Sequence, residues 1–134
     1  MKSQLLPNMS DTTDIPARLN YPFVGIPSFL RSQICTDLDQ LDADIAVFGI
    51  PHDEGSPFLT GSRMGPRSIR EHSLRFGAQG SIYDPETRTQ YLSEELGQGL
   101  IADVGDVDVW PTEVRTTFKN ATDMTRKILA KGAF

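Results

Sequence analysis

The sequence has 134 residues, of which 38% are hydrophobic and 23% charged, and its formal net charge is -5. These values are typical of one globular domain, and the acidic balance argues against nucleic acid as a partner. The longest apolar stretch, Ile45 to Pro51, is far shorter than the about 20 residues of a membrane span. The single cysteine, Cys35, excludes an intrachain disulfide. With no secretion signal, this predicts a reducing, cytoplasmic setting without membrane contact.

The first 43 residues divide into two segments. Residues 1–20 are polar and contain few side chains that could pack, so we expect a flexible N-terminal tail. Residues 21–43 begin with an aromatic and apolar stretch that Pro22, Gly25 and Pro27 interrupt. Prolines and glycine prevent a long strand or helix there, so we expect an arm that packs against another element, and it is a candidate contact between subunits.

A β-α pattern follows from residue 44 onward. The continuous apolar run Ile45–Ile50 predicts a strand buried on both faces. After a loop with three glycines, Pro66 suits the first turn of a helix that we expect to end at Gly77. Three positions of this helix fall at helical spacing and are expected to share one face: Ile69, Ser73 and Phe76. The apolar content of residues 77–99 is too sparse to assign elements beyond a turn at 83–87.

The second half of the pattern is a strand and a long helix. Residues 100–104 predict a second strand, which continues into an acidic segment. The final helix has its apolar stripe predicted at Val114, Phe118, Ala121, Thr125, Ile128 and Leu129, with a stop at Gly132. A β-α-β pattern calls for another parallel strand after this helix. We therefore expect an α/β fold with a parallel sheet that is incomplete within these residues.

Three clusters of polar residues could carry chemistry. His52, Asp53 and Glu54 follow the first strand at its carboxyl end, where α/β sheets bind ligands. Neighbours in an extended segment point to opposite sides, which argues against a shared metal ion, and both a pocket-lining role and an ordinary loop role stay open.

The other two clusters are expected to be structural. Asp103, Asp106 and Asp108 lack the spacing of a calcium loop, so we expect their carboxylates to cap a turn or pair with arginines. Four arginines surround the first helix, and we expect a solvated helix face with an Arg67–Glu71 pair rather than an anion site. These arginines are Arg63, Arg67, Arg70 and Arg75. Cys35 has no base near it in the sequence, which argues against a nucleophilic role.

The segment from Asp44 to Arg70 resembles the N-terminal strand, loop and helix of the ureohydrolases, the arginase and agmatinase superfamily. The positions that match this pattern are Gly49, Pro51, Gly55, Arg63, Gly65, Pro66, Ile69 and Arg70. Further matches lie at 83–87, at Asp103-x-Gly105-Asp106-Val107 and at 128–133, so the resemblance spans residues 21–134. The arm at 23–31 and the His52–Glu54 variant look more like the guanidinobutyrases and guanidine hydrolases than the arginases.

The resemblance implies a three-layer α/β/α fold and hydrolysis of a guanidino compound to urea by a pair of Mn(II) or Ni(II) ions. It also implies a homo-oligomer, a trimer or hexamer, and a small guanidino substrate. The family's His and Asp metal-ligand motifs do not occur in this sequence. Residues 44–134 would then be the first β-α units of the domain, truncated before the first of these motifs, and the chain alone would be inactive.

Two further expectations depend on this resemblance. The loop after the first strand is expected to provide the wall of the substrate pocket, through His52, Glu54, Ser56 and Thr60. None of these residues is expected to be catalytic or a metal ligand. An alternative role stays open, in which the chain is noncatalytic and assembles with a full-length relative.

Overall fold

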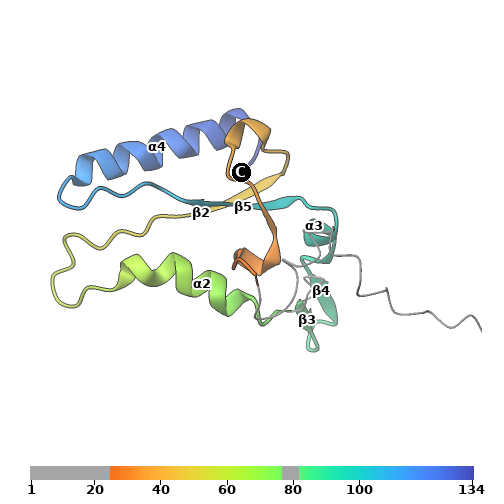
Figure 1. Cartoon of the computed structure of the whole chain (residues 1–134). Helices are drawn as coiled ribbons and strands as arrows, with labels where there is room; N and C mark the ends of the chain where they lie inside the picture. The colour runs from red at the N-terminus through yellow and green to blue at the C-terminus, as the bar shows by residue number, and fades with distance from the viewer. Residues whose placement is uncertain (1–24, 77–81) are drawn as a thin grey trace, which may run out of the picture.

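The computed structural model describes residues 25–76 and 82–134 of the chain. A three-stranded sheet lies between two helices that cover opposite faces, α2 (Gly65–Ser73) and α4 (Val114–Ala130) (Figure 1). The strand order is β1-β5-β2, and both pairs of neighbouring strands are parallel. The bounds of these strands are Gln33–Ile34 for β1, Ile45–Gly49 for β2 and Ile101–Asp106 for β5. The expected α/β fold with a parallel sheet is therefore confirmed.

The central strand, β5, is the most buried element of the sheet. Its residues from Ile101 to Val104 are all buried, as expected for an apolar strand with neighbours on both sides and a helix on each face. The strand β2 was expected to be buried as well, but only Gly49 is buried and its other residues are half-buried. This expectation was wrong because β2 lies at the edge of the sheet in the described part of the chain.

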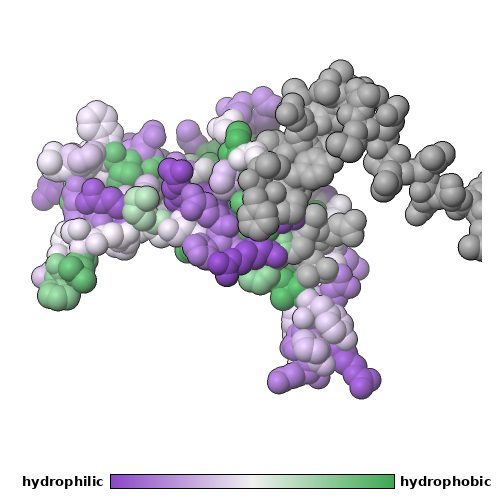
Figure 2. Space-filling view, turned by 60° about the horizontal axis from the view of Figure 1, so that its bottom comes forward, coloured by the Kyte–Doolittle hydropathy of each residue, from purple (hydrophilic) through white to green (hydrophobic). Residues whose placement is uncertain are grey.

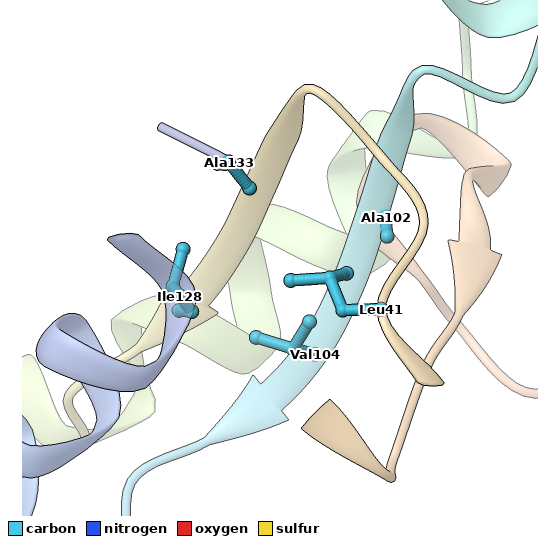
Figure 3. Close-up of a cluster of buried hydrophobic side chains, with 5 residues drawn as sticks. All are labelled: Leu41, Ala102, Val104, Ile128 and Ala133. Carbon is cyan, nitrogen blue, oxygen red and sulfur yellow. The ribbon is translucent and has the colours of Figure 1, made fainter. Parts of the chain in front are cut away.

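The hydrophobic core lies between the sheet and α4. The buried cluster consists of Ala102 and Val104 of β5, Ile128 of α4, and Leu41 and Ala133, with Leu41 lying beside Val104 (Figure 3). Half-buried side chains pack around this cluster: Cys35, Leu38, Ala43, Ala46, Phe48 and Met124. The core thus joins β5 and α4 to residues that precede β2 in the sequence.

The buried face of α4 differs from the predicted stripe. Thr117 is fully buried and Met124 packs against the core, whereas Phe118 is 56% exposed. Thr117 faces inward because its hydroxyl oxygen accepts a hydrogen bond from the backbone N–H of Trp110 at 3.1 Å. The stripe is therefore shifted by one residue from the predicted phase at 118 and 125, although Ile128 is buried as expected.

The first helix is shorter and more polar on its inner face than expected. The helix α2 ends at Ser73, and two backbone bonds, from Arg75 to His72 and from Phe76 to Ser73, continue it as a turn. The predicted stop at Gly77 lies outside the described residues. Ile69 is 58% exposed, so its predicted place on the buried face was wrong.

A small hairpin and a short helix connect α2 to β5. The strands β3 (Ile82–Asp84) and β4 (Thr89–Tyr91) pair in antiparallel fashion, and α3 (Ser93–Gly97) follows them. Asp84 caps the turn by accepting bonds from the N–H of Glu86 and the hydroxyl of Thr87, which confirms the turn expected at 83–87. None of the helices in the described ranges has the length and apolarity that crossing a membrane requires.

The expected arm contributes to the sheet and the core from residue 28 onward. The 3-10 turn η1 (Phe29–Arg31) packs against α2, and β1 pairs with β5. A second turn, η2 (Leu38–Gln40), leads to the buried Leu41. The expected tail at 1–20 and the first residues of the arm, 21–24, lie outside the described residues. Contact of the arm with another subunit stays a prediction.

Candidate functional site at the carboxyl edge of the sheet

The loop that follows β2 is closed at its base by Asp53. The side chain of Asp53 is buried and accepts a hydrogen bond from the N–H of Gly61 at 2.8 Å. It also binds Arg63 through Nε at 2.8 Å and through Nη2 at 2.6 Å. The hydrogen bond from Arg63, with that from Gly61, lowers the pKa of Asp53 to about 2. Asp53 is therefore ionised at neutral pH and ties together the two ends of the loop.

Two of the predicted pocket residues connect this loop to α4 and to the segment that precedes it. The ring of His52 meets the ring of Phe118 edge-on, with 5.5 Å between the ring centres. The Oε1 atom of Glu54 accepts a hydrogen bond from the N–H of Thr112 at 2.8 Å. Thr112 has a φ of 73°, a left-handed conformation that is unfavourable for a β-branched residue. Glu54 thus helps to hold a strained turn in the neighbouring connection.

The other two predicted pocket residues remain on the exposed part of the loop. The hydroxyl of Ser56 donates to the carbonyl oxygen of Leu59 at 2.7 Å, which shapes the tip of the loop. Thr60 is exposed. The structure therefore places all four residues at the carboxyl edge of the sheet, but it does not bring their side chains to one point. Their role in a substrate pocket stays a prediction.

A second polar cluster forms where β5 ends. Arg70 of α2 binds Asp103 through Nε at 2.7 Å and through Nη2 at 2.9 Å. It also donates to Asp106 at 2.6 Å and to the carbonyl oxygen of Gly105 at 2.7 Å. The N–H of Phe29 completes the cluster with a bond to Asp103 at 2.8 Å. The prediction that these carboxylates pair with arginines is thus confirmed for Asp103 and Asp106.

The guanidinium of Arg70 compensates the buried charge of Asp103, whereas the second carboxylate of the cluster, Asp106, is 39% exposed to solvent. Burial alone would raise the pKa of Asp103, but the hydrogen bonds from Arg70, Phe29 and Gly105 outweigh burial and lower it. The same carboxylates raise the pKa of the Arg70 guanidinium. The expected solvated helix face is confirmed for Arg67, which pairs with Glu71 at 3.0 Å. It was wrong for Arg70, whose side chain is only 11% exposed.

Neither cluster provides a site for a metal ion. Within residues 25–76 and 82–134, no three His, Cys, Asp or Glu side chains are grouped so that they could hold one. The buried carboxylates of Asp53 and Asp103 already bind arginines and backbone N–H groups. The described residues therefore do not fit the metal pair that the ureohydrolase resemblance implies.

Sequence reasoning missed Asp53 and Arg70 as the organising residues of this edge. In an extended segment, the side chains of adjacent residues point to opposite sides. This rule indicates that Asp53 points away from the side to which His52 and Glu54 point. Arg70 lies one helical turn before the buried Ser73, so both lie on the inner face of α2, where Arg70 binds Asp103 and Ser73 accepts from the N–H of Leu30. The sequence contains no pattern that distinguishes Arg70 from the exposed Arg67, because it does not show which of the two lies next to Asp103 and Asp106.

Residues 43–134 match the family model described as the arginase family. The chain belongs to the arginase family. It is 32% identical over 109 residues to "Guanidino acid hydrolase, mitochondrial" of Homo sapiens, covering 81% of the chain and 28% of that protein. It is 42% identical over 114 residues to an agmatinase of Chromobacterium violaceum, covering 83% of the chain and 32% of that protein. Guanidinopropionase of Pseudomonas aeruginosa is 27% identical over 126 residues, covering 94% of the chain and 35% of that protein.

The arginase-family chain thus spans about a third of the length of these relatives. Several positions that carried the resemblance have defined structural roles. Arg63 closes the loop at Asp53, and Arg70 holds the end of β5. Gly49 allows β2 to approach the first turn of α2, where an added Cβ would lie 2.5 Å from the Cβ of Pro66. The shared pattern therefore shapes the carboxyl edge of the sheet.

Proposed function

We propose that this chain forms the N-terminal part of a hydrolase that cleaves a small guanidino compound and releases urea. The observation that carries the proposal is the match of residues 43–134 to the arginase family. The names of the relatives, agmatinase, guanidino acid hydrolase and guanidinopropionase, support a guanidino compound as the substrate class.

The proposed enzyme would use a pair of metal ions, Mn(II) or Ni(II), and such a pair would supply an activated water for the hydrolysis. The family's His and Asp metal-ligand motifs do not occur in this sequence, so we assign the ligands to the remaining length of such a hydrolase, of which this chain matches about a third. We therefore expect the chain alone to be inactive.

The contribution of this chain is to build one wall of the active-site opening. The Asp53–Arg63 pair closes the loop after β2, and Glu54 connects that loop to Thr112. Held in this way, His52, Glu54, Ser56 and Thr60 can line the path of a substrate to the carboxyl edge of the sheet. Glu54 is the only one of the four with a charge that can attract a guanidinium group.

Assembly and location are also part of the proposal. The exposed apolar side chain of Phe58, at 87%, supports burial against other protein surfaces, as in the trimers or hexamers that the family resemblance implies. The single cysteine supports a reducing, cytoplasmic environment.

A covalent chimera tests this proposal. Residues 43–134 replace the matching segment of the Chromobacterium violaceum agmatinase, to which the chain is 42% identical. The chimera is assayed for urea with agmatine, 4-guanidinobutyrate and 3-guanidinopropionate in the presence of Mn(II) or Ni(II). We expect urea from at least one substrate and none from the 134-residue chain alone. A folded, metal-loaded chimera that releases no urea, or an active chain alone, would contradict the proposal.

A further inference from the structure

The segments that follow β2 and β5 are joined to each other at the carboxyl edge of the sheet. In Figure 1 both segments lie at the same end of the molecule, and Figure 2 shows hydrophobic as well as polar side chains at that end. The ring of His52 contacts the ring of Phe118 in α4, and Glu54 accepts the N–H of Thr112 at 2.8 Å. One aromatic contact and one polar contact therefore hold the two segments together.

Two aromatic side chains stay accessible to solvent in this joined region. Trp110 precedes Thr112 by two residues, and its N–H donates to the hydroxyl of Thr117, the residue before Phe118. This bond places the backbone of Trp110 beside the part of α4 that carries Phe118. The side chains of Trp110 and Phe118 are 60% and 56% exposed. Exposed aromatic side chains on an anchored segment are typical of a binding surface.

The carboxylate of Glu54 keeps part of its capacity to bind a cation. Its Oε1 atom accepts from Thr112, and Glu54 forms no ion pair within the described ranges. Arg63 is the nearby cation: a hydrogen bond and the charge of Asp53 raise the pKa of its guanidinium, and the charge of Glu54 adds to this effect. The Nε and Nη2 atoms of Arg63, however, bind Asp53. A cation that binds Glu54 therefore displaces no ion-pair partner.

We propose that this joined region is a recognition patch for an alkylammonium group, the cationic tail of a guanidino substrate. The patch consists of His52, Glu54, Trp110 and Phe118. This inference rests on the proposed function. Glu54 supplies the opposite charge, while the faces of Trp110 and Phe118 attract a cation and shield its methylene groups from water. The edge-on contact with His52 holds the ring of Phe118 in place.

The patch selects among guanidino compounds by the charge of the tail. A substrate whose guanidinium group is at the reaction centre presents only its other end to the patch. An ammonium tail is attracted by Glu54, whereas a carboxylate tail is repelled by it. The geometry thus favours a substrate with a cationic tail over one with an anionic tail.

Titration of the complete 134-residue chain with three ligands tests the patch. Agmatine, butylguanidine and 4-guanidinobutyrate share a guanidinium group, and their tails are cationic, neutral and anionic. Trp110 is the single tryptophan, so its fluorescence reports on the patch directly. We expect saturable binding of agmatine, about fivefold weaker binding of butylguanidine and still weaker binding of 4-guanidinobutyrate. Equal affinities for agmatine and butylguanidine would overturn the proposal, as would the absence of agmatine binding to the folded chain.

Variants at Glu54 separate its charge from its hydrogen bond. Glu54→Gln retains an oxygen that can accept the N–H of Thr112 but removes the charge. Glu71→Gln is the matched control, because it removes an exposed charge that pairs with Arg67 outside the patch. We expect the affinity for agmatine to fall about fivefold in the first variant and to stay unchanged in the second. An unchanged affinity in Glu54→Gln would show that Glu54 acts only in holding the turn.

Variants at Phe118 test the aromatic part of the patch. Phe118→Leu removes the ring from an exposed position and keeps an apolar side chain. We expect it to weaken agmatine binding about twofold to fivefold, the range of a cation–π contact at an exposed site. Phe118→Tyr keeps the ring and should bind agmatine like the unmodified chain. Equal losses in both variants would contradict recognition by the ring.

The covalent chimera extends the test to turnover. Glu54→Gln should raise the KM for agmatine about fivefold, leave kcat nearly unchanged and lower the KM for 4-guanidinobutyrate. If circular dichroism shows that the 134-residue chain alone is unfolded, calorimetric titration of the chimera with the three ligands decides instead. A chimera that binds the ligands in the expected order but releases no urea would contradict the proposed function only. Urea release with unchanged KM values in Glu54→Gln would overturn the patch alone.

Discussion

Arg70 of α2 binds Asp103 of β5 through two of its nitrogens, although the two residues are 33 positions apart in the sequence. This contact fastens a helix to the most buried strand through a charged pair rather than through apolar packing. Because Asp103 is buried, its carboxylate depends on Arg70 for compensation. The cluster is therefore a sensitive point of the fold.

We expect Arg70→Met to lower the free energy of unfolding by about 3 kcal/mol, because it leaves the buried carboxylate of Asp103 without its partner. Urea unfolding followed by circular dichroism measures this loss. Arg67→Met is the matched control on the same helix, since the Arg67 side chain is 73% exposed. Its effect should stay within about 0.5 kcal/mol, as for other exposed pairs. Equal effects of both changes would contradict this role of Arg70.

Gly49 is expected to tolerate no side chain. An added Cβ would collide with the carboxylate of Asp106 and lie 2.5 Å from the Cβ of Pro66. Gly49→Ala should therefore destabilise the chain by about 1–3 kcal/mol, in the range of overpacked cores. Gly97→Ala is the control, because a Cβ there meets no atom within 4 Å and Gly97 lies in a helix. A Gly49→Ala chain with unchanged thermal stability would refute the close approach.

Stability is expected to fall in acid. The pKa values of Asp53 and Asp103 are lowered in the folded chain, that of Asp53 to about 2, by their bonds to Arg63 and Arg70. A lowered folded-state pKa adds stability that is fully present above the unfolded value of about 3.9 and is lost as the pH falls toward 2. Urea midpoints measured between pH 6 and pH 2 should decline in this window. Asp53→Asn should make the decline shallower, and an identical profile would argue against the pair.

Glu54 is expected to control the turn at Thr112. Glu54→Ala removes the acceptor of the Thr112 N–H, and the left-handed conformation of Thr112 then loses its support. Amide exchange at Thr112 should accelerate several-fold in this variant. Glu54→Gln retains an oxygen that can accept the same bond and should behave like the unmodified chain. Slow exchange in Glu54→Ala would show that the turn is held by other contacts.

The sequence predicted where the helices and strands lie better than it predicted which of their residues are buried. The apolar run at 45–50 and the helix from residue 114 are both present, because long apolar patterns report local structure reliably. Burial depends instead on which strands become neighbours, and the pairing of β2 with β5 across more than 50 residues has no local pattern. The half-exposed β2 and the polar inner face of α2 could not be predicted for the same reason.

The candidate site shows the same division. The resemblance located the carboxyl edge correctly, since Arg63 and Arg70 both act there. It could not indicate that Asp53, rather than its neighbours, is the buried anchor of the loop, because that choice depends on which way the strand turns its side chains. Hydrogen-bond partners ten or more residues apart become visible only in three dimensions.

The strand order has a consequence for synthesis of the chain. Strand β5 lies between β1 and β2, so among the described residues neither of these earlier strands has its main partner until residues 101–106 have been made. Residues 33–49 therefore lack this partner strand while more than 50 further residues are synthesised, including α2 and the β3–β4 hairpin. Nascent chains that stop before residue 101 should therefore stay unfolded, and the sheet should become stable only after α4 has been made, because Ile128 and Ala133 complete its core.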